Sequence, residues 1–173
     1  MTEYRRPCLY DPAVHDRGDF SCSEAAYGEW LRRYAGQSRR NDTAAIWVIA
    51  DAEFKVVAYA SLSMTGIDLA KAPAALGKRS PDPIPGLLIG RLAVDERHEG
   101  LRLGTELVKR ILATAVELNQ TAALRAVVVT ALDDRARSWW RDRLGFVPFD
   151  PEDPENFDLH LLTKDIQATL DAL

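Results

Sequence analysis

Residues 91–112 read RLAVDERHEGLRLGTELVKRIL and combine an apolar strand, a charged turn with glycine, and an amphipathic helix. A helix that follows directly on a buried strand presents unpaired backbone N–H groups and the positive end of its dipole. The turn at residues 99–105 therefore suits a phosphate or diphosphate group. Gly100 and Gly104 would permit close approach of a ligand to the backbone. Glycines at such a turn can also serve chain geometry alone, so both interpretations stay open.

The segments before this turn predict one helix and three strands. Tyr27, Trp30, Leu31 and Tyr34 recur at helical spacing, which predicts a helix over residues 24–37 capped by Ser21 or Ser23. Three β-rich runs follow, and they occupy residues 44–51, 54–67 and 86–95. The first two runs are separated by a spacing that suits a hairpin.

The segments after the turn predict a helix packed on a sheet and a return to strands. The long helix places its apolar side chains on one stripe, formed by Leu103, Leu107, Ile111, Ala115 and Leu118. A continuous apolar run at residues 123–132 is typical of a central strand. A short helix over residues 133–143 ended by Gly145, a strand at 156–163 and a tail helix at 164–173 complete the order. This order predicts a mixed α/β sheet flanked by helices.

Composition predicts one soluble domain over residues 1–173. The 173 residues are 47% hydrophobic, which is enough for one substantial core. No signal peptide pattern follows Met1 and no run approaches the roughly 20 apolar residues of a membrane span, so we expect a soluble, intracellular chain. Cys8 and Cys22 lack metal-ligand spacing, and we expect neither a metal site nor a disulfide.

The net charge of −4 argues against a protein whose whole surface binds nucleic acid, because the general electrostatic footprint of such a protein is basic. Local patches remain possible. Basic residues gather in two segments, at Arg32, Arg33, Arg39 and Arg40 and at Arg135, Arg137, Arg141 and Arg143, and residues 150–158 form an acidic loop. Solvated helix faces are the plainer interpretation of both clusters.

The stretch EGLRLG, residues 99–104, resembles the signature of the GCN5-related N-acetyltransferases (GNAT), which use acetyl-CoA. That signature is Gln or Arg, two variable residues, Gly, one variable residue, then Gly or Ala, between a strand and a helix. Here Glu99 replaces its first residue, Arg102 occupies the usual middle glycine, and Gly100 falls two positions earlier. A guanidinium near a diphosphate can add charge-assisted hydrogen bonds, provided that the backbone conformation of Arg102 is one that a non-glycine residue tolerates.

The resemblance covers the chain almost end to end and implies a mixed, mostly antiparallel sheet flanked by helices. It also implies an acetyl-CoA site in which strand 92–94 pairs with the pantetheine arm and residues 99–105 surround the diphosphate. The implied site residues are Leu92, Ala93, Val94, Glu99, Gly100, Leu101, Arg102, Leu103, Gly104 and Thr105, with Asp133 and Arg137 on a helix that flanks the thioester.

A narrower resemblance is to the acetyltransferase toxins of bacterial toxin–antitoxin pairs, which acetylate the amino group of aminoacyl-tRNA. It is carried by FSCSEAAYGEWLRRYAGQSRRN, AYASLS, GRLAVD and LLTKDIQATL. These toxins usually carry a tyrosine as general acid, and the position counted forward from Asp133 is Trp140, while counting backward from Gly145 gives Arg141. An indole N–H only donates a hydrogen bond and cannot supply a proton at neutral pH. Trp140 could steady the thiolate region or simply pack the helix on the sheet.

Acetyl transfer requires a neutral amine to attack the thioester carbonyl while coenzyme A leaves. Positioning of both reactants can supply much of the acceleration, so a dedicated acid is less necessary. A lysine acceptor would need a base, and the candidates by proximity to the turn are Asp95, Glu96 and His98. An exposed loop role is the default for His98, as a structural role is for His160.

Three readings of the function compete. The first is an acetyl-CoA-dependent N-acetyltransferase whose acceptor is a small amine or aminoacyl-tRNA. The second is a cytoplasmic tRNA-directed toxin held by an antitoxin protein. The third is a degenerate acetyltransferase fold that binds a partner. The resemblance further implies a homodimer, because this family often forms dimers.

Overall fold

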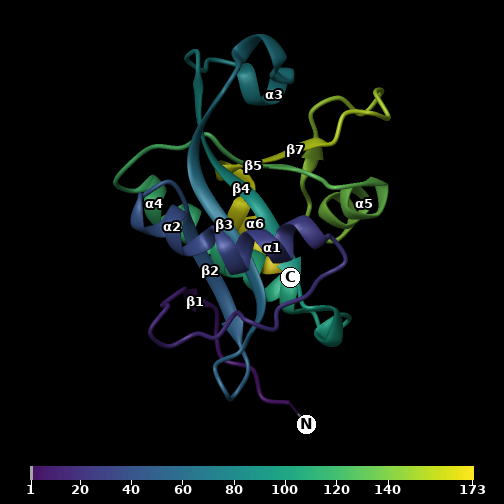
Figure 1. The fold of residues 1–173 in the computed structure, drawn as a ribbon. Coiled ribbons are helices and arrows are strands. Elements are labelled where there is room, and N and C mark those ends of the chain that lie inside the picture. The colour runs from purple at the N-terminus through teal and green to yellow at the C-terminus, as the bar shows by residue number, and fades with distance from the viewer. Residues whose placement is uncertain (1) are drawn as a thin grey trace. The chain divides into compact units, whose positions relative to one another are not determined.

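The computed structural model describes residues 2–173, and Figure 1 shows their fold. The strands are β1 (Cys8–Leu9), β2 (Ala45–Ala50), β3 (Val56–Ile67), β4 (Ile84–Val94), β5 (Ala126–Thr130), β6 (Val147–Pro148) and β7 (Asp158–Leu162). The α-helices are α1 (Ala25–Arg33), α2 (Ala35–Arg40), α3 (Ala74–Gly77), α4 (Leu103–Asn119), α5 (Asp134–Asp142) and α6 (Ile166–Ala172). Three 3₁₀ turns occupy Leu69–Lys71, Glu96–His98 and Thr163–Asp165.

The seven strands form one sheet in the order β1-β2-β3-β4-β5-β7-β6. Strands β4 and β5 run parallel, with Gly86 opposite Ala126 and Ile89 opposite Val129. The pairs β1–β2, β2–β3, β5–β7 and β6–β7 are antiparallel. The predicted mixed, mostly antiparallel sheet is confirmed.

The longer elements match the prediction, and three shorter ones were missed. The apolar runs at 44–51, 54–67, 86–95 and 123–132 contain β2, β3, β4 and β5. Strands β1 and β6 are two residues each and lie at the two edges of the sheet, and α3 lies within a loop rich in proline. Elements this short carry no periodicity of their own and form because neighbouring backbone supplies their hydrogen bonds.

The predicted helix over residues 24–37 was wrong in two respects. It is divided at Tyr34, whose φ of −114° departs from helical geometry, and a second helix continues to Arg40. The N-cap is Glu24 instead of Ser21 or Ser23, and its carboxylate accepts a hydrogen bond from Ala26 N–H. A longer side chain can therefore replace the serine cap.

The chain groups into two compact units, and each has its own core. The first unit comprises Met1–Ser63 and Gly90–Arg110. In it, α1 and α2 cover one face of β2 and β3 (Figure 1). Its core cluster consists of Tyr10, Phe20, Leu31, Ala35, Ile46, Val48, Val56, Tyr59 and Ala93.

The second unit comprises Met64–Ile89 and Ile111–Leu173. One of its core clusters consists of Ile67, Leu76, Ile84, Ala126, Val128 and Leu162. Helix α4 runs through both units. Its predicted apolar stripe is buried at Leu103 and Leu107 in the first unit and at Ile111 and Ala115 in the second, where Leu118 is half-buried. No helix among residues 2–173 has the length and apolar character to cross a bilayer.

His160, on β7 in the second unit, is a buried ring whose environment makes the stability of the fold depend on pH. It is 2% exposed, lies edge-on to Phe149 at 5.4 Å between centroids, and its Nδ1 has no hydrogen-bond partner among residues 2–173. Burial lowers the pKa of His160, and a hydrogen bond with the Val147 backbone and the charge of Asp165 oppose this only in part.

We expect the free energy of unfolding to decrease as pH falls below the usual histidine pKa of about 6.5. In that range the unfolded chain binds a proton at His160, whereas the folded chain keeps the ring neutral. One pH unit below that value, this difference lowers the free energy of unfolding by at most about 1.4 kcal/mol. Urea unfolding at pH 7.5 and pH 5.5 measures the difference. A His160→Asn variant should lose this part of the pH dependence, and an unchanged dependence would contradict the assignment.

Candidate active site

The turn at residues 99–105 joins β4 to α4 through two left-handed residues. Gly100 has φ of +77° and Arg102 has φ of +61°. The backbone N–H of Glu106 donates to the Arg102 carbonyl at 3.0 Å, so Arg102 is the last residue before the helix. The predicted condition on Arg102 is therefore met, since its conformation is the left-handed one that a non-glycine residue adopts at a cost of about 1–2 kcal/mol.

The first turn of α4 contains N–H groups that the helix cannot bond within itself. The amides of Leu103, Gly104 and Thr105 lie in the first turn, where a helix has no partner for them within itself. Residues 99–102 are exposed, whereas all three of these helical residues are buried. A Cβ added at Gly100 would meet no atom within 4 Å, so this glycine is needed for its conformation and not for space.

Strand β4 extends past its parallel neighbour β5 toward this turn. Its pairing with β5 covers residues 86–89, and residues 92–94 lie beyond that paired stretch. The Ala93 side chain is buried in the core cluster of the first unit, while Leu92 and Val94 are half-buried. Backbone groups of residues 92–94 could therefore pair with an extended ligand while the side chain of Ala93 packs inward.

Asp95 is fully buried directly after β4, and its contacts do not favour the role of a general base. Its carboxylate accepts hydrogen bonds from the Ser21 N–H at 3.1 Å and from Arg97 Nε and Nη2 at 2.8 Å each. Burial raises the pKa of Asp95, but the hydrogen bonds from Arg97 and from the Ser21 backbone outweigh it, so the pKa lies below its usual value. A carboxylate held in this way is a weak base with no free lone pair facing a substrate.

His98 is half-buried and makes a contact that no local sequence pattern indicates. Its Nδ1 is 2.9 Å from the Tyr4 hydroxyl, and the two rings lie edge to face at 5.7 Å. The N-terminal segment thereby contacts the residue before the turn. An exposed loop histidine was expected, and this partner lies more than 90 positions away in the chain.

An aromatic and cationic cluster in the first unit lies next to residues 92–94. Arg91 lies over the Trp30 ring at 4.3 Å, and Trp30 stacks on Tyr59 at 6.0 Å. The Tyr59 hydroxyl donates to the Tyr27 carbonyl at 2.7 Å, which fixes the stack against α1. Sequence reasoning missed Arg91, although a charged residue inside an apolar strand run was a visible signal.

On α5, in the second unit, two of the predicted site residues have structural partners. Asp133 is the N-cap and accepts from Ala136 N–H at 2.8 Å. Arg137 donates to the carbonyls of Pro154 and Asn156 at 2.9 and 3.1 Å and lies over the Phe157 ring at 4.6 Å. Its guanidinium therefore holds the acidic loop in place. These contacts account for the position of the Arg137 side chain without a bound ligand.

Trp140 is buried and serves packing. It is 4% exposed and meets Trp139 and Phe146 edge to face at 5.0 and 4.9 Å. The helix carries no tyrosine in its printed sequence, DRARSWWRD. Arg141, the other position reached by counting, is exposed and pairs with Asp142 at 2.7 Å.

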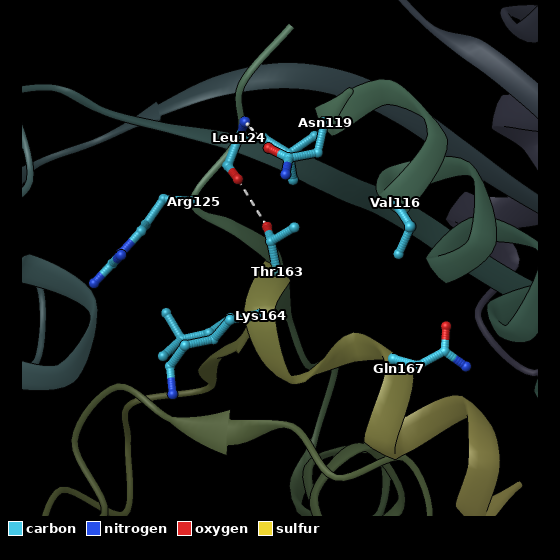
Figure 2. A pocket seen from close by; sticks show the side chains of 8 residues that line it. Val116, Asn119, Leu124, Arg125, Thr163, Lys164 and Gln167 are labelled. Atoms are coloured by element: carbon cyan, nitrogen blue, oxygen red, sulfur yellow. Dashed lines mark hydrogen bonds between the residues drawn. The ribbon is translucent and has the colours of Figure 1, made fainter. Parts of the chain in front are cut away.

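A cavity of about 360 Å³ lies in the second unit between the end of α4, the start of β5 and the start of α6 (Figure 2). Two of its polar side chains are engaged, because Asn119 accepts from Leu124 N–H at 2.9 Å and Thr163 donates to the Leu124 carbonyl at 2.8 Å. The buried Nε of Arg125, by contrast, has no hydrogen-bond partner among residues 2–173. None of the predicted site residues lines it. Its lining is Val116, Asn119, Leu124, Arg125, Leu162, Thr163, Lys164 and Gln167.

No group of three His, Cys, Asp or Glu side chains that could hold a metal ion is found among residues 2–173. Cys8 and Cys22 are both free, half-buried thiols. Burial raises the pKa of each thiol, which keeps it protonated and unreactive at neutral pH.

The strand, left-handed turn and long helix are the arrangement that the GNAT signature requires. The sequence pattern that defines the acetyltransferase (GNAT) family matches residues 12–146. This chain belongs to that family. Its function is therefore that of an acetyltransferase.

Relatives of this chain include toxins. A tRNA-acetylating toxin of Mycobacterium tuberculosis (strain ATCC 25618 / H37Rv) is 31% identical over 174 residues, which cover 98% of this chain and 99% of the toxin. The structure of AtaT complexed with acetyl-methionyl-tRNAfMet is 24% identical, with a TM-score of 0.83 over 96% of this chain and 98% of that one. The structure of AtaTR bound with AcCoA is 23% identical, with a TM-score of 0.77 over 95% and 96%. These two structural likenesses establish the fold.

We expect Arg102→Gly to be more stable than Arg102→Ala by about 0.5–1 kcal/mol, because only glycine adopts positive φ without a steric cost. Both variants lose the guanidinium, so their difference isolates the backbone conformation. Chemical denaturation measures it. The same pair at Arg79, whose φ is +57°, is a matched control and should show a similar difference. Equal stability of the two Arg102 variants would contradict the left-handed conformation.

We expect Trp140→Ala to cost about 3–5 kcal/mol of stability, because it empties a buried aromatic contact, whereas Trp140→Phe keeps most of the packing. If Trp140 only packs, the phenylalanine variant should keep its acetyl-transfer rate within about twofold, an estimate that follows from the lack of a proton to donate. Urea unfolding and steady-state kinetics test both parts. A large loss of kcat in Trp140→Phe would assign a catalytic role to the indole N–H.

Proposed function

We propose that this chain transfers the acetyl group of acetyl-CoA to the α-amino group of an aminoacyl-tRNA. The acetyltransferase family gives the reaction class. The acceptor rests on the end-to-end similarity, at 31% identity, to a tRNA-acetylating toxin. The observation that carries the cofactor part is the turn at residues 99–105, where two residues of positive φ present the first amides of α4.

The residues that would hold acetyl-CoA are those of β4 and the turn. Amides of Leu103, Gly104 and Thr105 suit the diphosphate, and the exposed Arg102 side chain can add a positive charge there. Backbone groups of residues 92–94 suit the pantetheine arm and a hydrogen bond to the thioester carbonyl. Asp133 and Arg137 keep their capping and loop contacts in this proposal, so their part is to shape α5 and the acidic loop.

The transfer itself is a direct attack. A neutral amine forms the N–C bond to the thioester carbonyl, the C–S bond breaks, and the proton lost by nitrogen ends on the coenzyme A sulfur. An α-amino group has a pKa near 8, against about 10.4 for lysine, so an appreciable fraction is neutral without a base. An α-amino acceptor therefore needs neither a general base nor a tyrosine acid. This agrees with a site in which the Asp95 carboxylate is bonded to Arg97 and α5 carries no tyrosine.

Basic residues on α1 and α2 are the surface that we assign to the tRNA. Arg39 and Arg40 are exposed in the last turn of α2, and Arg33 is exposed on α1, where it pairs with Glu29 at 3.0 Å. A local basic patch can bind phosphates although the net charge is −4. Arg32 instead donates to the Phe20 carbonyl and is used structurally.

The remaining assignments follow from the same likeness. We infer an antitoxin protein as a partner, a second copy of the chain as a dimer partner, and a cytoplasmic location. We also infer that residues 1–173 act as one catalytic domain, because β3 and β4 each run through both compact units. A degenerate, partner-binding fold is the second candidate, and the buried Trp140 at the family's acid position is the observation that favours it.

We expect the purified chain and acetyl-CoA to yield N-acetylated aminoacyl-tRNA, detected by mass spectrometry after release of the aminoacyl group. Uncharged tRNA is the negative control. Gly104→Leu should abolish acetyl-CoA binding in calorimetry, because a bulky side chain enters the first turn of α4, whereas Gly104→Ala should retain it, since the family signature admits alanine. Binding without transfer to any aminoacyl-tRNA would refute the acceptor, and absence of acetyl-CoA binding would favour the partner-binding fold.

A further inference from the structure

The turn that would bind the diphosphate is preceded by a second, tightly bonded turn, residues 95–98. Asp95 begins it and is the only fully buried acidic side chain among residues 2–173. Within the turn, its carboxylate accepts from the Arg97 N–H at 3.0 Å as well as from Arg97 Nε and Nη2, and its carbonyl accepts from the His98 N–H at 2.8 Å. One side chain thus closes the turn on itself.

The 95–98 turn is bonded to two other segments of the first unit, and the Asp95 carboxylate makes one of the bonds to the 19–21 segment. The Ser21 N–H donates to Asp95 at 3.1 Å, and the Glu96 N–H donates back to the Ser21 carbonyl at 2.9 Å. Arg97 Nη2 also donates to the Asp19 carbonyl at 2.8 Å. On β3, the Val57 carbonyl accepts from the Asp95 N–H at 2.8 Å.

Residues 99–102, which follow this turn, are not held by burial in the core. They are exposed, and two of the four have positive φ. Their direction is set at one end by α4 and at the other end by the 95–98 turn. An error in the direction of the entering chain would misplace the amides that must converge on one diphosphate, and sub-ångström placement decides such binding.

We propose that Asp95 is a positioning residue that fixes the 95–98 turn to the 19–21 segment and so orients residues 99–105 for acetyl-CoA. This inference rests on the proposed function. Asp95 touches no reacting atom. Arg97 neutralises its charge through two parallel hydrogen bonds, so a carboxylate can lie close to a diphosphate site without repelling the ligand strongly.

Asp95→Asn tests the proposal because it preserves size and removes one acceptor. The amide nitrogen cannot accept from Ser21 N–H or from Arg97 Nη2, so both of these hydrogen bonds are lost and donors face a donor. We expect the KM and Kd for acetyl-CoA to rise about tenfold, which corresponds in free energy to one charged hydrogen bond. We expect kcat to change by less than about twofold, because transfer chemistry uses other groups.

Asp51 supplies the matched control. It belongs to the same unit, is 8% exposed, and accepts from the Glu53 and Lys55 N–H groups at 3.0 and 2.9 Å. It closes the turn between β2 and β3, not the one at residues 95–98. Asp51→Asn should lower the melting temperature as Asp95→Asn does, yet leave the KM for acetyl-CoA unchanged.

A second measurement needs no cofactor. Hydrogen exchange of the ligand-free protein should show faster exchange at residues 96–105 in Asp95→Asn and not in Asp51→Asn. Arg97→Gln should give the same pattern more weakly, and it is the variant to use if Asp95→Asn fails to fold. Unchanged exchange and KM in the Asp95 and Arg97 variants, or equal changes in the Asp51 control, would overturn the proposal. Faster exchange confined to the Asp95 and Arg97 variants, together with a wild-type protein that binds no acetyl-CoA, would instead refute the proposed function and leave only the role of Asp95 in holding the 95–98 turn.

Discussion

Unpaired amide groups at the first turn of α4 are the feature on which the proposed chemistry depends. A helix cannot satisfy its own first N–H groups, so they are available wherever the preceding chain leaves them open to a ligand. Here the chain leaves them open by turning through Gly100 and Arg102 in the left-handed region. A non-glycine residue at position 102 has a conformational cost in this region, and Arg102 places a cationic residue directly before the first turn of α4.

Burial of Asp95 shows how the first unit supports that turn. A buried carboxylate is costly unless it is paired and hydrogen-bonded, and Asp95 satisfies both conditions through Arg97 and the Ser21 backbone. The same bonds that make it a poor base make it a rigid anchor. Catalytic and structural roles are alternatives for such a group, because lone pairs that hold the fold are not free to take a proton.

Helix α5, in the second unit, also carries side chains that the fold uses structurally. Arg137 holds the acidic loop through two carbonyls and the Phe157 ring, and Trp140 fills space between Trp139 and Phe146. The contacts of these two side chains are therefore those of packing and loop attachment. In the proposed reaction, acceleration comes from placing the amine and the thioester together and from backbone polarisation of the carbonyl, which suits the proposed α-amino acceptor because it is partly neutral at physiological pH.

The sequence by itself determined the order of the long elements, because periodicity and turn residues act locally. It located β2 to β5, α4 and α5, the N-cap Asp133 and the turn at residues 99–105. It also identified Arg102 as the position whose conformation had to be special, since a family glycine is replaced there. These features depend on residues within a few positions of one another.

Tertiary structure alone decided which side chains are free to act. Whether Asp95 is a base or an anchor depends on Ser21, 74 positions away, and the role of Arg137 depends on carbonyls of the acidic loop. The two-residue strands β1 and β6 likewise exist only because a neighbouring strand offers hydrogen bonds. No local pattern encodes such partners, because burial and pairing are set by where distant segments meet and not by the residue types that meet there.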